Sequence, residues 1–238
     1  MPYVYPLPDL IPRALVDELR ETLLADSAPW VDGRRTAGRD GGKKRNLEID
    51  GNSPLRMAAS NRLTDVLANG QSPAAVGFRY AADPKQIGPF MFSRTGPGGG
   101  YGDHMDNNFM GRGTPNEMRS DLSMTIFLSD PDSYQGGSLV LDSDMPFAPR
   151  FKMPAGSAVL YSTTSVHRVD PVTAGNRLVA VTWIESRISD PFSRQINADL
   201  LEVLNLVSQD GVCSNNARPY LVTKLEKIRG NLTKRLSA

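Results

Sequence analysis

The ten residues DLSMTIFLSD, 121–130, predict a β-strand with two unlike faces. Every second side chain is apolar, and hydroxyl side chains and one phenylalanine stand between them. The apolar set is Leu122, Met124, Ile126 and Leu128, and the other set is Ser123, Thr125 and Phe127. Because successive side chains of a strand point to opposite sides, this period of two places each set on its own face.

Three further β-branched or aromatic runs follow, namely GSLVLDS (137–143), SAVLYST (157–163) and NRLVAVTWIES (176–186). The segments between them, DPDSYQGG (130–137), MPAG (153–156) and DPVTAGN (170–176), predict turns. Several short strands at this spacing, between about residues 86 and 186, predict a closed or two-sheet antiparallel structure such as a jelly roll.

The two ends of the chain show helical periodicity instead. Leucines recur every four residues in IPRALVDELRETLLAD, 11–26, and a second helix is predicted over 54–70, ending at Gly70. Two apolar stripes predict further helices near the end of the chain: Ile196, Leu200, Leu204 and Val207, then Leu221, Leu225, Ile228 and Leu232. The fold class expected is therefore mainly β with flanking helices.

Charge and cysteine content restrict the setting. With 27 basic and 26 acidic residues the net charge is +1, so nothing global indicates a nucleic acid or an anionic membrane as partner. The single cysteine, Cys213, cannot form an internal disulfide, which favours a reducing compartment. Neither a signal peptide nor a long apolar run is found. We expect a soluble cytoplasmic protein.

Two glycine-rich segments are predicted to be irregular. VDGRRTAGRDGGKKRNLE, 31–48, is polar and locally basic, which favours a solvated loop, or else a mobile flap beside a binding site. TGPGGGYG, 95–102, lacks both the lysine–serine pair and the spacing of a phosphate-binding loop. A tight turn into the following strand explains it better.

The chain has only two histidines, and the first lies in YGDHMDNNF, 101–109. On a strand, His104 and Asp106 would point to the same side, and Asp103 and Met105 would point away. That geometry suits two adjacent coordination positions on one metal. A single such pair is insufficient evidence, since a lone histidine on a strand is more often structural.

The second histidine, His167, comes 63 residues later, at the end of another strand-like run. Together with His104 and Asp106 it would make two histidines and one carboxylate. That set occupies one face of an octahedral metal and leaves the other face open, as in non-haem Fe(II) oxygenases. Zinc also accepts two histidines and a carboxylate, so a zinc hydrolase is an alternative.

Arg177 lies ten residues beyond His167, at the start of the next strand. An antiparallel hairpin through RVDPVTAGN, 168–176, would bring its guanidinium back towards the metal. An arginine binds a carboxylate through two parallel hydrogen bonds and keeps its charge when buried. It would suit the far carboxylate of a dicarboxylic cosubstrate. Taken alone, it would more often be an exposed residue at a strand end.

At these residues the chain resembles the Fe(II)- and 2-oxoglutarate-dependent dioxygenases, and more narrowly the bacterial PKHD-type hydroxylases, relatives of prolyl 4-hydroxylase. The resemblance rests on His104, Asp106, His167 and Arg177 and on motifs from the N-terminal helix to about residue 207. These are WVDGRRTAG (30–38), YGDHMDN (101–107), MRSDLSMTIFLSDPDSYQGGSLVL (118–141), PAGSAVLYSTTSVHRVDPVTAGNR (154–177) and WIES (183–186).

The resemblance implies a double-stranded β-helix in a dioxygenase domain, 1–207, followed by a C-terminal helical extension, 208–238. It implies Fe(II) on His104, Asp106 and His167, and 2-oxoglutarate with its distal carboxylate on Arg177. O₂ would be consumed, succinate and CO₂ released, and L-ascorbate would serve as reductant. The substrate would be a peptidyl residue, prolyl by analogy, or a small molecule. The last apolar stripe also permits a homodimer, although packing on a sheet is commoner.

Two departures from the family pattern concern the pocket. Ser93, Arg94 and Thr95 stand where the family usually has asparagine, arginine and tyrosine, so the tyrosine hydroxyl is lost from the pocket, which affects contacts with the cosubstrate or the substrate. KKRNLE, 43–48, contains only Asn46 where the family's polar stretch is richer in asparagine, which indicates a different substrate preference.

Each alternative function predicts sequence features that differ from those of a 2-oxoglutarate-dependent dioxygenase. A zinc hydrolase gives Arg177 no role, and an iron-dependent nucleic-acid demethylase would bring a second close arginine and a basic groove. A non-catalytic β-barrel binding module would have a broken ligand set. Near the site, Trp183 and Tyr161 are predicted core residues, and Arg168 and Arg94 are candidates for the mouth.

Overall fold

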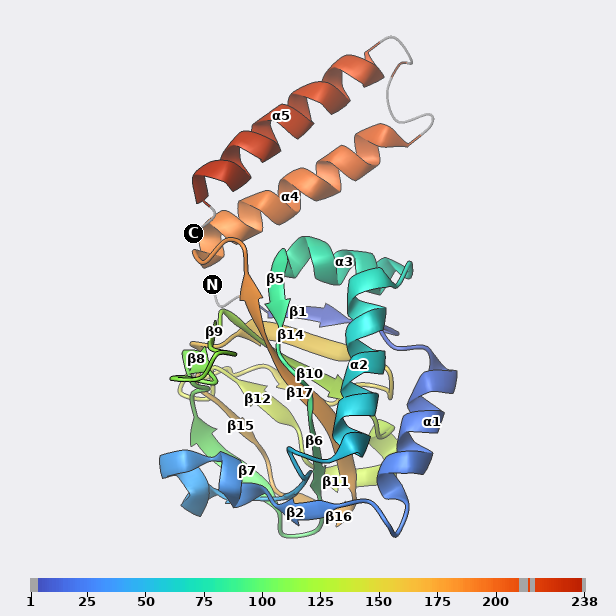
Figure 1. The fold of residues 1–238 in the computed structure, drawn as a ribbon, viewed down its shortest axis with the longest axis vertical. Helices are drawn as coiled ribbons and strands as arrows, with labels where there is room; N and C mark the ends of the chain where they lie inside the picture. Colours follow the sequence, from blue (N-terminus) through green and yellow to red (C-terminus); the bar gives the residue numbers. More distant parts are fainter. Residues whose placement is uncertain (1–3, 210–213, 215–216, 237–238) are drawn as a thin grey trace.

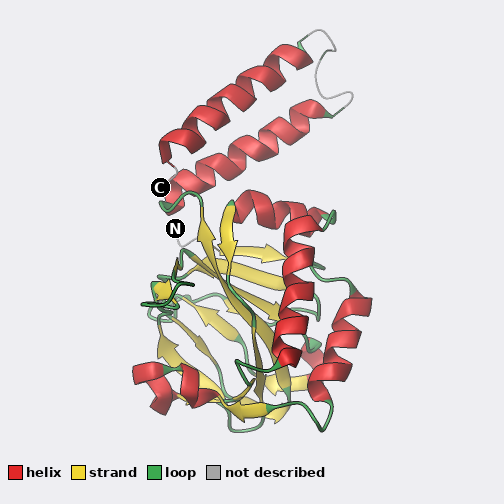
Figure 2. Ribbon diagram, viewed as in Figure 1, coloured by secondary structure: helices red, strands yellow, loops and turns green. Residues whose placement is uncertain are grey.

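The computed structural model describes residues 4–209, 214 and 217–236 and consists mainly of antiparallel sheets with flanking helices (Figures 1 and 2). The larger sheet has the order β1 (Val4–Leu7), β14 (Ala158–Ser162), β10 (Leu122–Phe127), β17 (Arg177–Ser186), β6 (Met91–Thr95), β4 (Leu47–Ile49) and β2 (Trp30–Asp32). β5 (Pro84–Ile87) pairs with the far end of β17.

The smaller sheet has the order β13 (Arg150–Phe151), β12 (Leu139–Leu141), β15 (His167–Val169), β7 (Gly100–His104) and β3 (Lys44–Arg45). Two short ribbons complete the strands: β11 (Tyr134–Gly136) pairs with β16 (Val172–Gly175), and β8 (Phe109–Met110) pairs with β9 (Met118–Arg119). The strands expected from the period-two runs at 122–128, 137–143, 157–163 and 176–186 are all present, so that prediction is confirmed.

Strand β10 shows how the larger sheet uses both faces. Leu122, Met124 and Ile126 belong to a buried cluster shared with α1 (Arg13–Leu24), α2 (Pro54–Asn69) and α3 (Pro73–Ala82). Phe127, on the other face, packs against Leu139 and further residues of the smaller sheet in a second cluster. The alternation in the sequence therefore separates a face covered by helices from a face that looks into the space between the sheets.

Helices α1 and α2 were expected from the sequence; Pro12 directly precedes α1, and α2 has a capped start. Ser53 accepts a hydrogen bond from the Arg56 amide at the start of α2, and Pro54 occupies the first turn. Helix α3 was not predicted. Ser72 and Pro73 start it in the same way, but it is only ten residues long and contains Gly77, so its periodicity is faint.

The expected turns at 130–137 and 170–176 were predicted incorrectly in part, because they contain β11 and β16. The pairing is irregular between Gln135 and Gly136, and Gly136 and Gly175 adopt positive φ angles, which glycine tolerates. The same glycines that suggested turns therefore allow a bulged ribbon.

The segment 31–48 is more ordered than a solvated loop. Two short 3₁₀ helices, Gly33–Thr36 and Gly38–Lys43, lie between β2 and β3. β3 then pairs with β7 of the smaller sheet, and β4 pairs with β6 of the larger one. This segment therefore connects the edges of the two sheets.

Both predicted C-terminal helices are present, as α4 (Pro191–Ser208) and α5 (Arg218–Leu236), which pair side by side and extend away from the sheets (Figure 1). Leu221 and Ile228 remain 37% and 52% exposed, so α5 does not pack on a sheet. The division of the chain at residue 207 and a homodimer both stay predictions, and Cys213 lies outside the described residues. None of the described helices has the length and hydropathy of a membrane span.

The helix-covered face provides a test of the fold. Leu160 in β14 is fully buried there, between β1 and β10. We expect Leu160→Ala to lower the free energy of unfolding by about 2–5 kcal/mol, because it leaves a cavity in a packed core. Urea denaturation measures this. Met57→Ala, at a 58% exposed position of α2, is the control, with an expected change within about 0.5 kcal/mol. Equal losses in the two variants would contradict this packing.

Candidate metal and cosubstrate site

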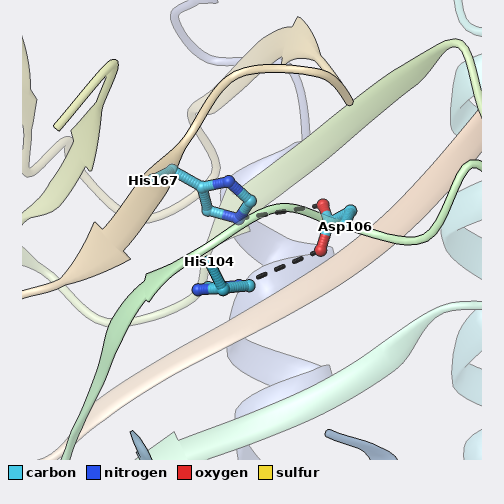
Figure 3. A group of neighbouring side chains, drawn as sticks. All are labelled: His104, Asp106 and His167. Carbon is cyan, nitrogen blue, oxygen red and sulfur yellow. Dashed lines mark ion pairs between the residues drawn. The ribbon is translucent and has the colours of Figure 1, made fainter. Parts of the chain in front are cut away.

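The two histidines are directly opposite each other in the smaller sheet. His104 is the last residue of β7 and His167 the first of β15, and the two Cα atoms are register partners. Both side chains are buried, 8% and 4% exposed, and their ring centroids lie 4.2 Å apart. Figure 3 shows both rings and the Asp106 carboxylate turned towards one another. One donor atom from each residue lies within 4.8 Å of the others, a grouping that suits a metal ion.

Backbone carbonyls fix which nitrogen of each ring faces the site. His104 Nδ1 lies 2.8 Å from the Gly102 carbonyl oxygen, and His167 Nδ1 lies 3.0 Å from that of Ser165. Each Nδ1 must therefore bear the proton and donate it, which leaves the Nε2 lone pairs for a metal. Burial lowers the pKa of His104 to about 4, so this ring is neutral near pH 7.

Asp106 reaches the site from beyond the strand. The sequence analysis placed it on the same strand as His104, but β7 ends at His104 and residues 105–107 belong to no strand or helix. Asp106 Oδ1 nevertheless lies 4.0 Å from His104 Nε2, and Oδ2 lies 3.8 Å from His167 Nε2. The predicted grouping is therefore present, although the strand geometry that suggested it is not. Met105, expected to point away, also lines the cavity.

Aromatic rings pack around the histidines. Tyr101 stacks on His104 with centroids 3.5 Å apart, and Tyr161 meets His167 edge-on at 5.2 Å. Burial, together with the nearby Asp106 carboxylate, raises the pKa of Tyr161, so its hydroxyl stays protonated. These contacts restrict the imidazoles to one orientation.

Arg177 lies in the same cavity, at the start of β17, and is only 3% exposed. No acidic side chain of the described residues pairs with it, and its buried Nε has no hydrogen-bond partner there. Burial lowers its pKa, but an arginine still stays protonated. A buried cation without an acidic partner is costly, and a bound anion would offset that cost.

Tyr134 and Gly137, which the sequence analysis missed, shape the surroundings of Arg177. The Tyr134 hydroxyl is buried beside the guanidinium, and burial raises its pKa. A Cβ atom on Gly137 would lie 3.1 Å from Arg177 Cδ and 2.9 Å from Val172 Cγ2, so only glycine leaves room there. Both residues belong to the segment 130–137, whose composition predicted a turn and gave no indication of a contact with Arg177.

The cavity that joins these groups has a volume of about 310 Å³. The triad and Arg177 share it with residues of both sheets and of the 31–48 segment. These include Thr36, Lys44, Asn46, Thr95, Thr125, Tyr161, Val179 and Trp183. Trp183 and Tyr161, predicted as core residues, therefore also form its wall.

Other site predictions need correction. β15 and β17 lie in different sheets, so the simple hairpin expected between His167 and Arg177 is absent, and Arg177 reaches the cavity from the opposite sheet. Neither proposed mouth residue lines this cavity. Arg168 pairs with Asp170 at 3.0 Å, and Arg94 lies 4.7 Å from the centre of the Trp30 ring.

A buried charge pair supports the 31–48 side of the cavity. Lys44 Nζ lies 2.5 Å from Glu48 Oε1 and donates to Thr36 Oγ1 at 2.8 Å. The Thr36 hydroxyl donates in turn to Glu48 Oε2, and Asn46 links Glu48 to Ser93. Lys44 and Glu48 are 5% and 2% exposed, so neither charge is well solvated and each depends on the other.

Residues 90–185, which form most of the two facing sheets, match the family model of the 2OG-Fe(II) oxygenase superfamily. A PKHD-type hydroxylase of Prochlorococcus marinus is 43% identical over 82% of each chain. One of Xanthomonas campestris is 37% identical over 86% of this chain and 88% of that protein, and one of Burkholderia ambifaria is 36% identical over 96% of each.

Solved structures show the same fold at low sequence identity. A Pseudomonas putida prolyl-4-hydroxylase has a TM-score of 0.51 at 16% identity, over 77% of this chain and 92% of that one. A Trichoplax adhaerens prolyl hydroxylase, solved with a hypoxia-inducible-factor peptide fragment, has a TM-score of 0.54 at 14% identity, over 83% and 86%. The predicted double-stranded β-helix is confirmed.

The fold and the matched residues define a Fe(II)- and 2-oxoglutarate-dependent dioxygenase. Within that class the chain belongs to the PKHD-type hydroxylases, as its motifs predicted. This membership favours the oxygenase over the zinc hydrolase and over the non-catalytic binding module.

The charge pair next to the cavity yields a prediction about stability. We expect Glu48→Ala to lower the free energy of unfolding by about 3–5 kcal/mol, because it leaves Lys44 buried without a counter-charge. The double variant Lys44→Met with Glu48→Leu is expected to lose less, since no unpaired charge remains. Urea unfolding of the three proteins measures the difference. If the double variant were less stable than Glu48→Ala, the unpaired Lys44 charge could not explain the lower stability of Glu48→Ala.

Proposed function

We propose that His104, Asp106 and His167 bind Fe(II) and that Arg177 binds the distal carboxylate of 2-oxoglutarate. The observation that supports this most directly is that one cavity contains both a His–Asp–His donor set and a buried guanidinium with no acidic partner among the described residues. The donor set has the ligand types of non-haem Fe(II) sites, and its single carboxylate compensates part of the metal's charge.

The bound metal and cosubstrate would supply the oxidising chemistry: O₂ is consumed, 2-oxoglutarate is converted to succinate and CO₂, and the substrate gains a hydroxyl group. The chain's own residues bind and orient the reactants. Arg177 binds the distal carboxylate through two parallel hydrogen bonds, which orients the cosubstrate and selects a dicarboxylate of matching length. Thr95, the register partner of Arg177, and Thr125 add hydroxyl groups to the same wall.

The substrate is proposed to be a peptidyl residue, prolyl by analogy with the structural relatives, with a small molecule as the second candidate. The cavity reaches the surface, because Thr36, Met105 and Asn107 line it and are themselves exposed. A side chain of a peptide could enter there while the main chain stays outside. L-ascorbate is the proposed reductant. The near-neutral charge and single cysteine support a cytoplasmic enzyme without a nucleic-acid or membrane partner.

Anaerobic addition of Fe(II) and then 2-oxoglutarate tests the site. We expect the weak visible charge-transfer band of the chelate in the wild type and none in His167→Ala, because that variant lacks one ligand. Absorption spectroscopy under nitrogen is the measurement. No band in a folded, metal-loaded wild-type protein would contradict the proposed chelate.

Arg177→Met separates cosubstrate binding from stability. We expect the variant to bind 2-oxoglutarate roughly thirty-fold more weakly or worse, since losing one partner of a buried charge pair costs about 2–5 kcal/mol. The cosubstrate-free variant should be at least as stable as the wild type, because it loses a buried charge that has no acidic partner among the described residues. Titration of the chelate band and thermal unfolding give the two values. Arg187→Ala, at an exposed arginine just beyond β17, is the matched control.

Succinate release during turnover then allows substrates to be screened. We expect a proline-containing peptide to raise succinate formation above the uncoupled level and to gain 16 Da by mass spectrometry. Stimulation by small molecules alone would replace the peptidyl proposal by the second candidate.

A further inference from the structure

The Asp106 carboxylate lies on a stretch of chain that the sheets do not hold. Residues 105–107 have no strand or helix conformation, whereas both histidines are in paired strands. A carboxylate can rotate about two side-chain bonds and can offer a metal one oxygen or two. Its orientation must therefore come from side-chain contacts.

One such contact comes from Ser123, in the middle of β10. The Ser123 hydroxyl donates to Asp106 Oδ2 at 2.7 Å, and Ser123 is completely buried. Its register partners on the two neighbouring strands are Tyr161 and Trp183, so large rings flank it on both sides. The position of the hydroxyl is thereby restricted.

Two further hydroxyl groups stand behind Ser123. Thr163 Oγ1 lies 3.1 Å from Ser123 Oγ and 3.3 Å from Ser120 Oγ, and Thr163 and Ser120 are 0% and 6% exposed. An ionised carboxylate can only accept, so the one proton of Ser123 goes to Asp106. Thr163 must then donate to Ser123, and Ser120 to Thr163. All three hydroxyl dipoles therefore point towards Asp106, an arrangement in which each bond strengthens the next.

We propose that Ser123 is a positioning residue for Asp106: supported by Thr163 and Ser120, its hydrogen bond to Oδ2 holds the carboxylate in the orientation that faces both histidines. This inference rests on the proposed metal site. Carboxylates that bind metals are themselves usually held by hydrogen bonds, and losing such a bond weakens metal binding.

Metal affinity tests the proposal without requiring turnover. Mn(II), whose unbound form is counted by electron paramagnetic resonance, is titrated into the full chain at pH 7. We expect Ser123→Ala to bind Mn(II) roughly 10- to 100-fold more weakly, the usual cost of losing a group that orients a ligand. Ser123→Thr, which keeps the donor, is expected to recover most of the affinity.

Ser60→Ala is the matched control. Ser60 is 3% exposed on α2, and its hydroxyl accepts a hydrogen bond from the Phe90 amide at 2.9 Å, on the helix side of the larger sheet. The variant loses an equally buried hydrogen bond but should retain wild-type Mn(II) affinity. An equal loss of affinity in Ser60→Ala and Ser123→Ala would show a general loss of structure and would overturn the positioning role.

Thr163→Val keeps the proposal testable even if Ser123→Ala does not fold. It preserves shape, leaves Ser123 in place and removes only the hydroxyl behind it. We expect a loss of affinity smaller than that of Ser123→Ala. Unchanged affinity in Thr163→Val would overturn the supporting chain, and unchanged affinity in a folded Ser123→Ala would overturn the positioning role itself. Both results leave the metal site intact. A wild-type protein that bound no Mn(II) would overturn the metal site and this inference together.

Discussion

The site depends on the antiparallel pairing of β7 with β15. That ladder makes His104 and His167 register partners, so two residues 63 positions apart in the sequence lie face to face. Because residues opposite each other in neighbouring strands have closely spaced side chains, the register sets the separation of the imidazoles. A shift of one residue would turn one ring to the other face of the sheet.

The larger sheet contributes the polar side chains that face the two histidines of the smaller sheet. β10 and β17 lie side by side in the larger sheet and place Ser123, Thr125 and Arg177 on the face that looks into the cavity. The opposite face of the same strands is apolar and is covered by α1, α2 and α3. The helices thus stabilise strands whose inner face contains polar groups, and the cavity can contain a buried cation although such a group does not favour folding.

Much of this could be predicted from the sequence, for physical reasons that differ by residue. The period of two in 122–128 is local, so both the strand and its faces were evident. The triad was found because the chain has only two histidines and both stand at strand ends. Ser123 and Tyr134 were missed because serine in a strand and tyrosine beside two glycines are ordinary residues. Only contacts formed in the fold distinguish them: Ser123 donates to Asp106, and the Tyr134 hydroxyl is buried beside Arg177. Helix α3 was missed because it has only ten residues and an interior glycine, and the β11–β16 ribbon was missed because its strands are short and its glycines indicate turns.

The departures from the family pattern have a structural counterpart in the wall between the sheets. Thr95, where the resemblance predicts a tyrosine, lies directly opposite Arg177, and a Cβ atom on Gly99 would lie 2.9 Å from the Thr95 Cγ2 atom, so Gly99 leaves room for the threonine side chain. Asn46 stands between β3 and β4, where the segment crosses from one sheet to the other, and its amide donates to Ser93 and Glu48. Leu47 and Glu48 of β4 are register partners of Arg94 and Ser93 of β6, so parts of both departures lie on neighbouring strands of the larger sheet. Substrate preference is expected to follow from this side, because the opposite side is occupied by the histidines.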